Sequence, residues 1–243
     1  FHFHRIFKSF VGESINEYVR RLRMEKSAGR LKYSKDPVTE IALDSGYGTP
    51  SSFNKAFQKV MGISPLKYRE TKSEAFGGNL NPSTKEIPMK PEMITMENLE
   101  VLFVRKTGSY FDTPAAAWKT LIKFSYKNYP SWEHNRKFGI AHDNPDITEK
   151  ENLRFDACIT APKEHIEKGE VGRQTLKGGK YAVFTHKGPY KTLEKAYDDI
   201  FTNWYPDNKD IVADVPSFVE YLNMELIDSA PEELLTKIYI PLK

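Results

Sequence analysis

The sequence has little cysteine and no long hydrophobic run. Among its 243 residues Cys158 is the one cysteine, which excludes an intrachain disulfide framework and a multi-cysteine metal site. No stretch approaches the roughly 18 apolar residues of a membrane-spanning helix. The first ten residues, FHFHRIFKSF, contain no apolar run typical of a secretory signal. We therefore expect a protein that works in the reducing cytoplasm, without a membrane partner.

The sequence also lacks metal and catalytic motifs. His2 and His4 are two residues apart, whereas metal-binding pairs on a helix need a spacing of three or four. His142, Asp143 and Asp146 fall in a turn-rich segment, where such residues serve ordinary turn chemistry. Residues 93–243 contain no phosphate-binding glycine loop and no nucleophile elbow. We expect no metal, no cofactor and no catalytic residue.

Charge is distributed unevenly along the chain. The apolar fraction of 39% and charged fraction of 28% are those of a globular protein. Residues 1–75 hold 14 Lys+Arg and 8 Asp+Glu, a net charge of +6. Residues 76–243 hold 22 Lys+Arg and 25 Asp+Glu, a net charge of −3. A basic module of this size favours a polyanionic partner, although a solvated helical surface has the same composition.

A linker separates these two parts. Residues 71–92 read TKSEAFGGNLNPSTKEIPMKPE, a stretch with Gly77-Gly78 and three prolines and with little apolar periodicity. The charge changes sign at the same place. We predict a basic domain at residues 1–72, a linker at 73–92 and a second domain at 93–243.

Helical periodicity dominates the first part. A long amphipathic helix is predicted over about residues 14–31, with Ser14 and Glu17 at the spacing of a capping box. Asp36-Pro37 is expected to cap and open a short helix that ends near Gly46. A third helix follows over about residues 51–61 and ends at Gly62. A short helix, a glycine turn and a second helix have the spacing of a helix-turn-helix motif.

The second helix of such a motif places its first residues against base edges in the major groove. Asn54 can bond adenine with both atoms of its amide, whereas serine and threonine are permissive donors and acceptors. Phe53 and Phe57 are interpreted as core residues. The residues expected to meet DNA here are Thr49, Pro50, Ser51, Ser52, Asn54 and Lys55.

The segments GESINEYVRRLRMEKSAGRL and DPVTEIALDSGYGTPSSFNKAFQKVMGISPLKYR resemble the DNA-binding domain of AraC/XylS-type transcription regulators. The resemblance implies two helix-turn-helix units joined by the long helix. FHFHRIFKSFVG then resembles the first recognition helix, where Phe1, His4 and Arg5 would face DNA and Lys8 would face phosphate. The family has further helices before this point, so we expect the native protein to be about two dozen residues longer and Phe3 and Phe7 to be partly uncovered.

The second part mixes strands and helices and contains an internal repeat. VLFVRKTGSY (101–110) and YAVFTHKGPY (181–190) each run from a strand through Gly-x-Tyr into a helix, at an offset of 80 residues. Two strand-helix-strand-strand units explain this pattern. Strands are predicted at 99–106, 138–141, 155–160, 179–187, 218–225 and 237–241, and helices at 114–126 and 193–204.

Aromatic residues recur in related positions of the two repeats. Two sheets that face each other could line a cleft with such rings, which suit flat or cationic organic ligands. The alternative is that most of these rings belong to the core. The candidate ligand-binding residues are Tyr110, Trp118, Tyr190, Trp204, Val219, Glu220, Tyr221 and Tyr239.

THKGPYKTLEKAYDDIFTNW, PSFVEYLN and APEELLTKIYIPL resemble a GyrI-like effector-binding domain. In that family a buried glutamate two residues before a tyrosine often meets a cationic ligand. Val219 stands at that place here, and Glu220 is one residue along, so in a strand its side chain faces the opposite way unless a bulge intervenes. We expect a pocket without the acid, which favours a neutral or amphipathic effector.

These observations predict a multi-domain protein: an all-α double helix-turn-helix domain with an incomplete first unit, then an α+β duplicated GyrI-like domain. The function expected is transcription regulation, with promoter DNA and a small effector as partners and RNA polymerase as a possible third. A GyrI-like hydrolase or sequestering protein is the alternative, and a gyrase-interacting protein is a third option.

Overall fold

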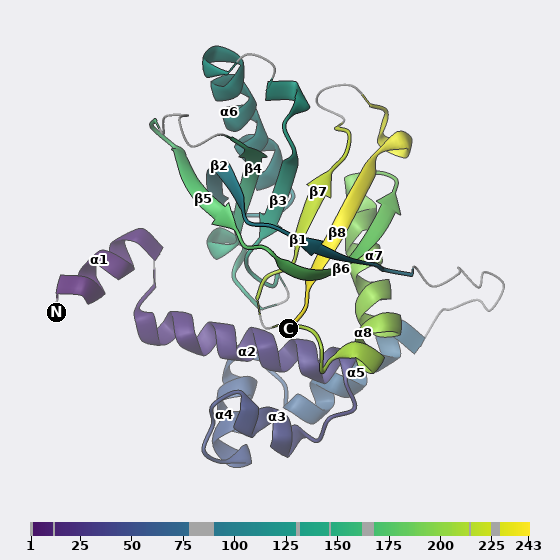
Figure 1. The fold of residues 1–243 in the computed structure, drawn as a ribbon. Coiled ribbons are helices and arrows are strands. Elements are labelled where there is room, and N and C mark those ends of the chain that lie inside the picture. Colours follow the sequence, from purple (N-terminus) through teal and green to yellow (C-terminus); the bar gives the residue numbers. More distant parts are fainter. Residues whose placement is uncertain are drawn as a thin grey trace. The chain divides into compact units, whose positions relative to one another are not determined.

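The computed structural model describes residues 2–11, 13–77, 90–129, 132–145, 147–161, 168–213, 215–224 and 229–243. The chain forms two compact units, one of Phe1–Ile87 with Asn144–Asn152 and one of Pro88–Asp143 with Leu153–Lys243 (Figure 1). Each unit is described by itself.

The first unit is helical. Its helices are α1 (His2–Val11), α2 (Ile15–Tyr33), α3 (Val38–Asp44), α4 (Pro50–Met61) and α5 (Pro65–Gly77). One apolar core joins α2 to α5 and consists of Met24, Ala28, Leu31, Ile41, Ala42, Phe53, Phe57 and Tyr68. The helix α5 continues through Gly77, so the first residues of the predicted linker are helical, and residues 78–89 lie outside the described part.

Side-chain caps explain where the helices begin, with one correction to the prediction. The capping box of Ser14 and Glu17 is present at the start of α2. The prediction that Asp36 caps α3 is wrong: the N-cap is Pro37, without a side-chain bond, and the Asp36 carboxylate instead accepts from Arg30 at 2.7 Å. Gly62 ends α4 with φ of 73°, a left-handed conformation that glycine adopts freely.

The segment Asn144–Asn152 packs with the first unit. Ile147 lies against the helical core. The Thr148 hydroxyl donates to Glu25 of α2, and Arg21 donates to Glu25 at 2.8 Å and to Glu13 at 2.6 Å. These contacts satisfy a charged cluster along one side of α2.

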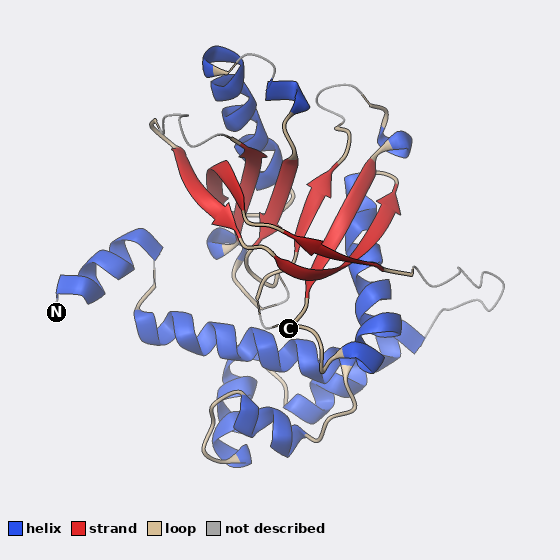
Figure 2. Ribbon diagram, viewed as in Figure 1, coloured by secondary structure: helices blue, strands red, loops and turns tan. Residues whose placement is uncertain are grey.

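The second unit contains one eight-stranded sheet in which every neighbouring pair is antiparallel (Figure 2). The strand order is β1-β6-β8-β7-β3-β4-β2-β5. The strands are β1 (Glu92–Met96), β2 (Leu99–Thr107), β3 (Lys137–Ala141), β4 (Arg154–Thr160), β5 (Val171–Leu176), β6 (Gly179–Lys187), β7 (Phe218–Tyr221) and β8 (Leu235–Pro241). The expectation of two sheets facing each other is wrong, because β3 and β7 join the two repeats edge to edge.

The predicted repeat is present and is one strand longer than expected. Its two copies are β1-β2-α6-β3-β4 and β5-β6-α7-β7-β8, with α6 at Thr113–Asn128 and α7 at Leu193–Asp199. The strands β1 and β5, which were not predicted, cross over, since β1 pairs with β6 and β5 pairs with β2. Gly108 and Gly188 hold matching φ values of 138° and 135° where β2 and β6 end.

The sheet has two differently covered faces. Residues that alternate along the strands pack under α6 and α7 on one face, which we call the helix face and define by Leu102, Val104, Val219, Tyr221 and Ile238. The other set forms a second core on what we call the opposite face, defined by Phe138, Cys158, Phe218 and Tyr239. The chain beyond α7 continues as a π-helical turn, Ile200–Trp204, and a short helix α8, Tyr205–Asn208.

Candidate nucleic-acid interface and effector site

The helix α4 exposes one polar face. Phe53 and Phe57 are fully buried in the helical core, which turns Ser51, Asn54 and Lys55 outward. The spacing of three and four residues between buried and exposed positions is that of an amphipathic surface helix. These three side chains make no bond with the described part of the chain, so their polar atoms are available to a partner.

Three other residues expected at DNA shape the start of α4. The Thr49 hydroxyl accepts the backbone N–H of Ser52 at 3.1 Å, and the Ser52 hydroxyl donates to the Thr49 carbonyl at 2.8 Å. Pro50 occupies the first turn, where a missing N–H costs nothing. All three are exposed, and they shape the start of α4.

The helix α1 presents His4, Arg5 and Lys8 to solvent. Phe7 packs on Tyr18 of α2 with the ring centroids 5.5 Å apart, while Phe3 is 66% exposed. Phe1 lies outside the described residues. The described candidate DNA contacts of α1 are therefore all exposed.

Two arginines of α2 position α3 and the turn into α4. Arg30 pairs with Asp36 and Asp44, at 2.7 and 2.5 Å, and thereby holds both ends of α3. The Arg23 guanidinium lies against Gly46, whose φ of 79° sets the turn. The sequence analysis did not single out these arginines, although Asp36 and Asp44 at the two ends of the short helix were an available signal.

In the second unit, three of the predicted ligand residues form one aromatic cluster on the helix face. Trp118 of α6 meets the Tyr221 ring edge-on at 5.6 Å, and Tyr190 meets it edge-on at 5.3 Å. Burial raises the pKa of Tyr221, so its hydroxyl stays protonated. Val219 shares this face, and Trp204 packs on Phe184 nearby in the same core.

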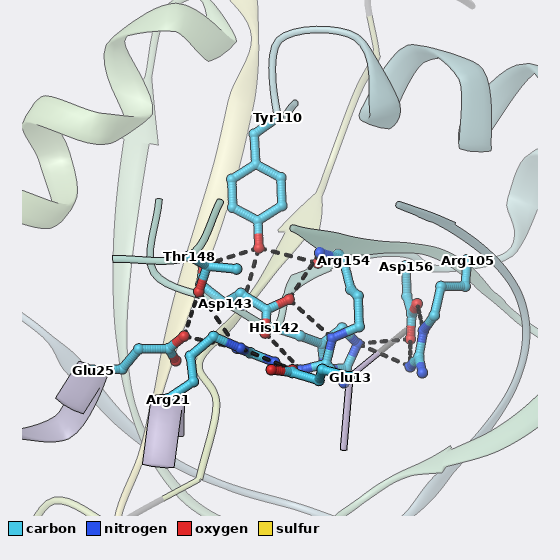
Figure 3. A network of polar contacts seen from close by, with 10 residues as sticks. All are labelled: Glu13, Arg21, Glu25, Arg105, Tyr110, His142, Asp143, Thr148, Arg154 and Asp156. Atoms are coloured by element: carbon cyan, nitrogen blue, oxygen red, sulfur yellow. Dashed lines mark hydrogen bonds and ion pairs between the residues drawn. The ribbon is translucent and has the colours of Figure 1, made fainter. Parts of the chain in front are cut away.

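Tyr110 has a different role. Its single hydroxyl proton is shared between the backbone carbonyl oxygens of Asp143 and Arg154, at 2.9 and 3.1 Å, and its oxygen accepts the Asp143 N–H at 3.0 Å. The buried Asp143 carboxylate pairs with the Arg154 guanidinium at 2.6 Å (Figure 3). Tyr110 therefore joins the ends of β3 and β4, and its polar atom is fully used.

Glu220 and Tyr239 lie on the opposite face of the sheet. The register of β7 is regular, with Glu220 beside Phe138 and Val219 beside Gly139. The Glu220 carboxylate accepts from Arg136 at 2.6 and 3.0 Å and from the Tyr239 hydroxyl. Burial alone would raise the pKa of Glu220, but these bonds outweigh it and lower the pKa. The Glu220 carboxylate is thus on the other face from Tyr221, and its negative charge is balanced by Arg136.

Sequence reasoning missed a second buried acid on that face. Asp156 is fully buried and accepts from Arg105 at 2.6 and 2.7 Å, with the His142 ring 2.8 Å away (Figure 3). Burial opposes its ionisation, yet the bonds to Arg105 and His142 prevail and bring its pKa to about 2. The sequence signal that could have revealed this acid is an aspartate in the middle of the otherwise apolar strand RFDACIT. Cys158 of this strand is buried, and burial raises the pKa of its thiol.

Within the described ranges, no group of three or more His, Cys, Asp or Glu side chains is placed to hold a metal ion. Nor does the described chain contain a helix both long and apolar enough to cross a membrane.

Two family models match the chain. A GyrI-like small molecule binding domain matches residues 89–243, and a helix-turn-helix domain matches residues 1–71. The transcriptional regulator Rob of Salmonella typhimurium is 25% identical over 205 residues, which are 77% of this chain and 68% of that protein. The Right origin-binding protein of Escherichia coli K12 is 26% identical over 208 residues, with the same coverage of 77% and 68%.

Solved structures agree with the fold. The crystal structure of the EcmrR C-terminal domain superposes with a TM-score of 0.54 at 18% identity, over 64% of this chain and 98% of that one. The structure of EcmrR in its DNA complex superposes with a TM-score of 0.56 at 14% identity, over 86% of this chain and 77% of that one. The chain belongs to the GyrI-like small-molecule-binding family and, like its homologue Rob, carries an AraC-type helix-turn-helix domain in front of the GyrI-like domain.

Proposed function

We propose that this protein regulates transcription by binding promoter DNA through its helical unit, under the control of a small molecule bound by its second unit. The observation that carries the proposal is the exposed polar face of α4, opposite the buried Phe53 and Phe57. The names of its homologues support it, since Rob is a transcriptional regulator. The cytoplasm, where promoter DNA lies, is the corresponding place of action.

The residues proposed to contact DNA differ in their tasks. Asn54 offers an amide that can bond an adenine edge, and Ser51 a hydroxyl that adapts to several bases. Lys55 on α4, and Arg5 and Lys8 on α1, supply positive charge for phosphates. Thr49 and Ser52 fix the helix start, so we assign them to orientation of α4.

The effector is proposed to bind on the helix face around Tyr221, where Trp118 and Tyr190 supply aromatic walls. Binding without turnover is expected, because the relatives with both domains are named as regulators. Coupling would appear as a change in DNA affinity or in contact with RNA polymerase.

The test is binding of the full chain to a fluorescent duplex from the region upstream of its own gene. Asn54→Ala should relax selectivity and weaken binding by about 1–3 kcal/mol at an adenine contact. Lys55→Ala should weaken binding to all duplexes alike and reduce the slope of log affinity against log salt concentration by about one. Lys123→Ala, which removes an exposed lysine of α6, is the matched control and should change neither. Equal effects of Lys55→Ala and Lys123→Ala would reject α4 as the DNA contact.

A further inference from the structure

Two buried donors beside Tyr221 make no hydrogen bond of ordinary geometry within the described residues. Trp118 is 3% exposed and Thr236 is fully buried. Neither the Trp118 Nε1 nor the Thr236 Oγ1 has a hydrogen-bond partner in the described part of the chain. The indole N–H lies close enough to the Tyr221 hydroxyl to favour ionisation of that hydroxyl, yet the two do not reach hydrogen-bond geometry. A buried donor left unpaired loses its hydrogen bonds to water without replacement, so a group outside the described chain is expected to accept from it.

Both donors flank one tyrosine from different elements. Thr236 of β8 is paired directly with Tyr221 of β7, so the two side chains share the helix face. Trp118 approaches the same ring from α6. Because α6 belongs to the first repeat and β7 and β8 to the second, the site is assembled by both copies of the duplication.

The surroundings of these donors favour an uncharged ligand. Burial raises the pKa of Tyr221 and of Tyr197 and lowers that of His186, which is paired with Thr236 from β6, so all three are neutral at pH 7. Val219 stands on this face, whereas Glu220 is bound by Arg136 on the other. An ion placed here would lose its hydration without a counter-charge.

We propose that the effector is an uncharged aromatic compound that carries a hydrogen-bond acceptor oxygen, which Trp118 and Thr236 bind. This inference rests on the proposed function and gives the chemistry of its effector. An indole N–H can only donate, so the ligand must supply the acceptor, such as a carbonyl or phosphoryl oxygen. The rings of Trp118, Tyr190 and Tyr221 supply edges and faces for its aromatic groups.

The test is calorimetric titration of the full chain with two matched pairs of probes. Benzophenone and diphenylmethane carry the same two rings and differ at the central carbon, which bears the acceptor oxygen in the first and two hydrogens in the second. Triphenylphosphine oxide and methyltriphenylphosphonium share a shape but differ in charge and acceptor. We expect the two oxygen-bearing compounds to bind at least fivefold more tightly than their partners. Tighter binding of the phosphonium ion, or binding of neither pair, would overturn the inference.

Substitutions test the two donors separately. Trp118→Phe and Thr236→Val each remove a donor and keep most of the side-chain volume. Each should weaken the binding of benzophenone about 5- to 30-fold and change the affinity for diphenylmethane by no more than about twofold. Trp132→Phe is the matched control, because it removes another buried indole N–H that has no hydrogen-bond partner among the described residues and whose ring packs on Tyr126 instead.

Thermal unfolding and DNA binding separate the remaining explanations. If Trp118→Phe and Thr236→Val lower the melting temperature and leave benzophenone binding unchanged, the donors serve a structural water and the inference is wrong. DNA binding of the same variants is read independently. If the unaltered chain binds DNA selectively but the probes fail, only the ligand class is rejected. If the unaltered chain shows no selective DNA binding, the proposed function is rejected.

Discussion

Asp156 shows how one residue can be held ionised in an apolar strand. Its carboxylate is fully buried, and Arg105 and His142 supply the bonds that keep its pKa near 2 instead of 3.8. A group whose pKa is lowered by folding stabilises the protein above its unfolded value. That contribution is lost as pH falls from about 4 towards 2.

Asp156→Asn should therefore destabilise the second unit by about 2 kcal/mol at pH 7, since one pKa unit corresponds to about 1.4 kcal/mol. The difference in the free energy of unfolding between the variant and the unaltered protein should shrink as pH falls below 4. Urea unfolding across this range measures it. Asp112→Asn, at an exposed position without a side-chain cap bond, is the control. A loss of stability that stays constant down to pH 2 would contradict the role given to the ion pair.

Arg136 and Glu220 form the second such pair. Arg136→Gln leaves the buried Glu220 carboxylate with the Tyr239 hydroxyl but without its cation, so its pKa should rise. We expect destabilisation of about 1–3 kcal/mol at pH 7, and less at pH 4, where Glu220 takes up a proton. The double variant with Glu220→Gln should recover part of the loss. Equal destabilisation at both pH values would show that the charge of Glu220 does not matter.

Strand alternation at Val219, Glu220 and Tyr221 was enough to predict that the acid and the tyrosine face opposite ways. The register of β7 with β3 agrees. The partner of Glu220 could not be predicted, because Arg136 is 84 residues away in sequence and only the strand pairing brings it close. The unpaired donors on Trp118 and Thr236 were equally out of reach, since they depend on three-dimensional packing.

At the scale of elements, the turn between α3 and α4 depends on Gly46. Its φ of 79° is unfavourable for other residues, and a Cβ there would lie 3.0 Å from the Arg23 guanidinium carbon.

Gly46→Ala should lower the stability of the helical unit by about 1 kcal/mol or more and weaken DNA binding by shifting α4. Gly48→Ala has open space and no positive φ, and should change neither property. Thermal unfolding and DNA titration of both variants compare the two positions. Similar behaviour of the two would show that the turn tolerates a side chain.

Local signals predicted the helices better than the strands. The capping box at Ser14 and the periodicity of α2 and α4 are properties of neighbouring residues, and they were confirmed. The strands β1 and β5 are short, and each pairs with the opposite repeat, so their formation depends on residues about 80 positions away. The assignment of Asp36 failed for a similar reason, since Arg30 of another helix takes its carboxylate.

At the scale of the whole molecule, function was predicted more readily than geometry. The charge asymmetry and the two resemblances indicated a DNA-binding part and an effector-binding part, and the family matches agree. The single sheet, with its two distinct faces, was not predicted, because periodicity does not tell whether two repeats stack or join at an edge.

The most direct test of the account is a titration of upstream promoter duplex with the full chain at several salt concentrations, with and without triphenylphosphine oxide. We predict sequence-selective binding that falls steeply with salt, as expected when cationic side chains displace counterions from phosphates, and an affinity that shifts when the compound is bound. Compound binding without selective DNA affinity would contradict the account and favour a protein that sequesters or degrades small molecules.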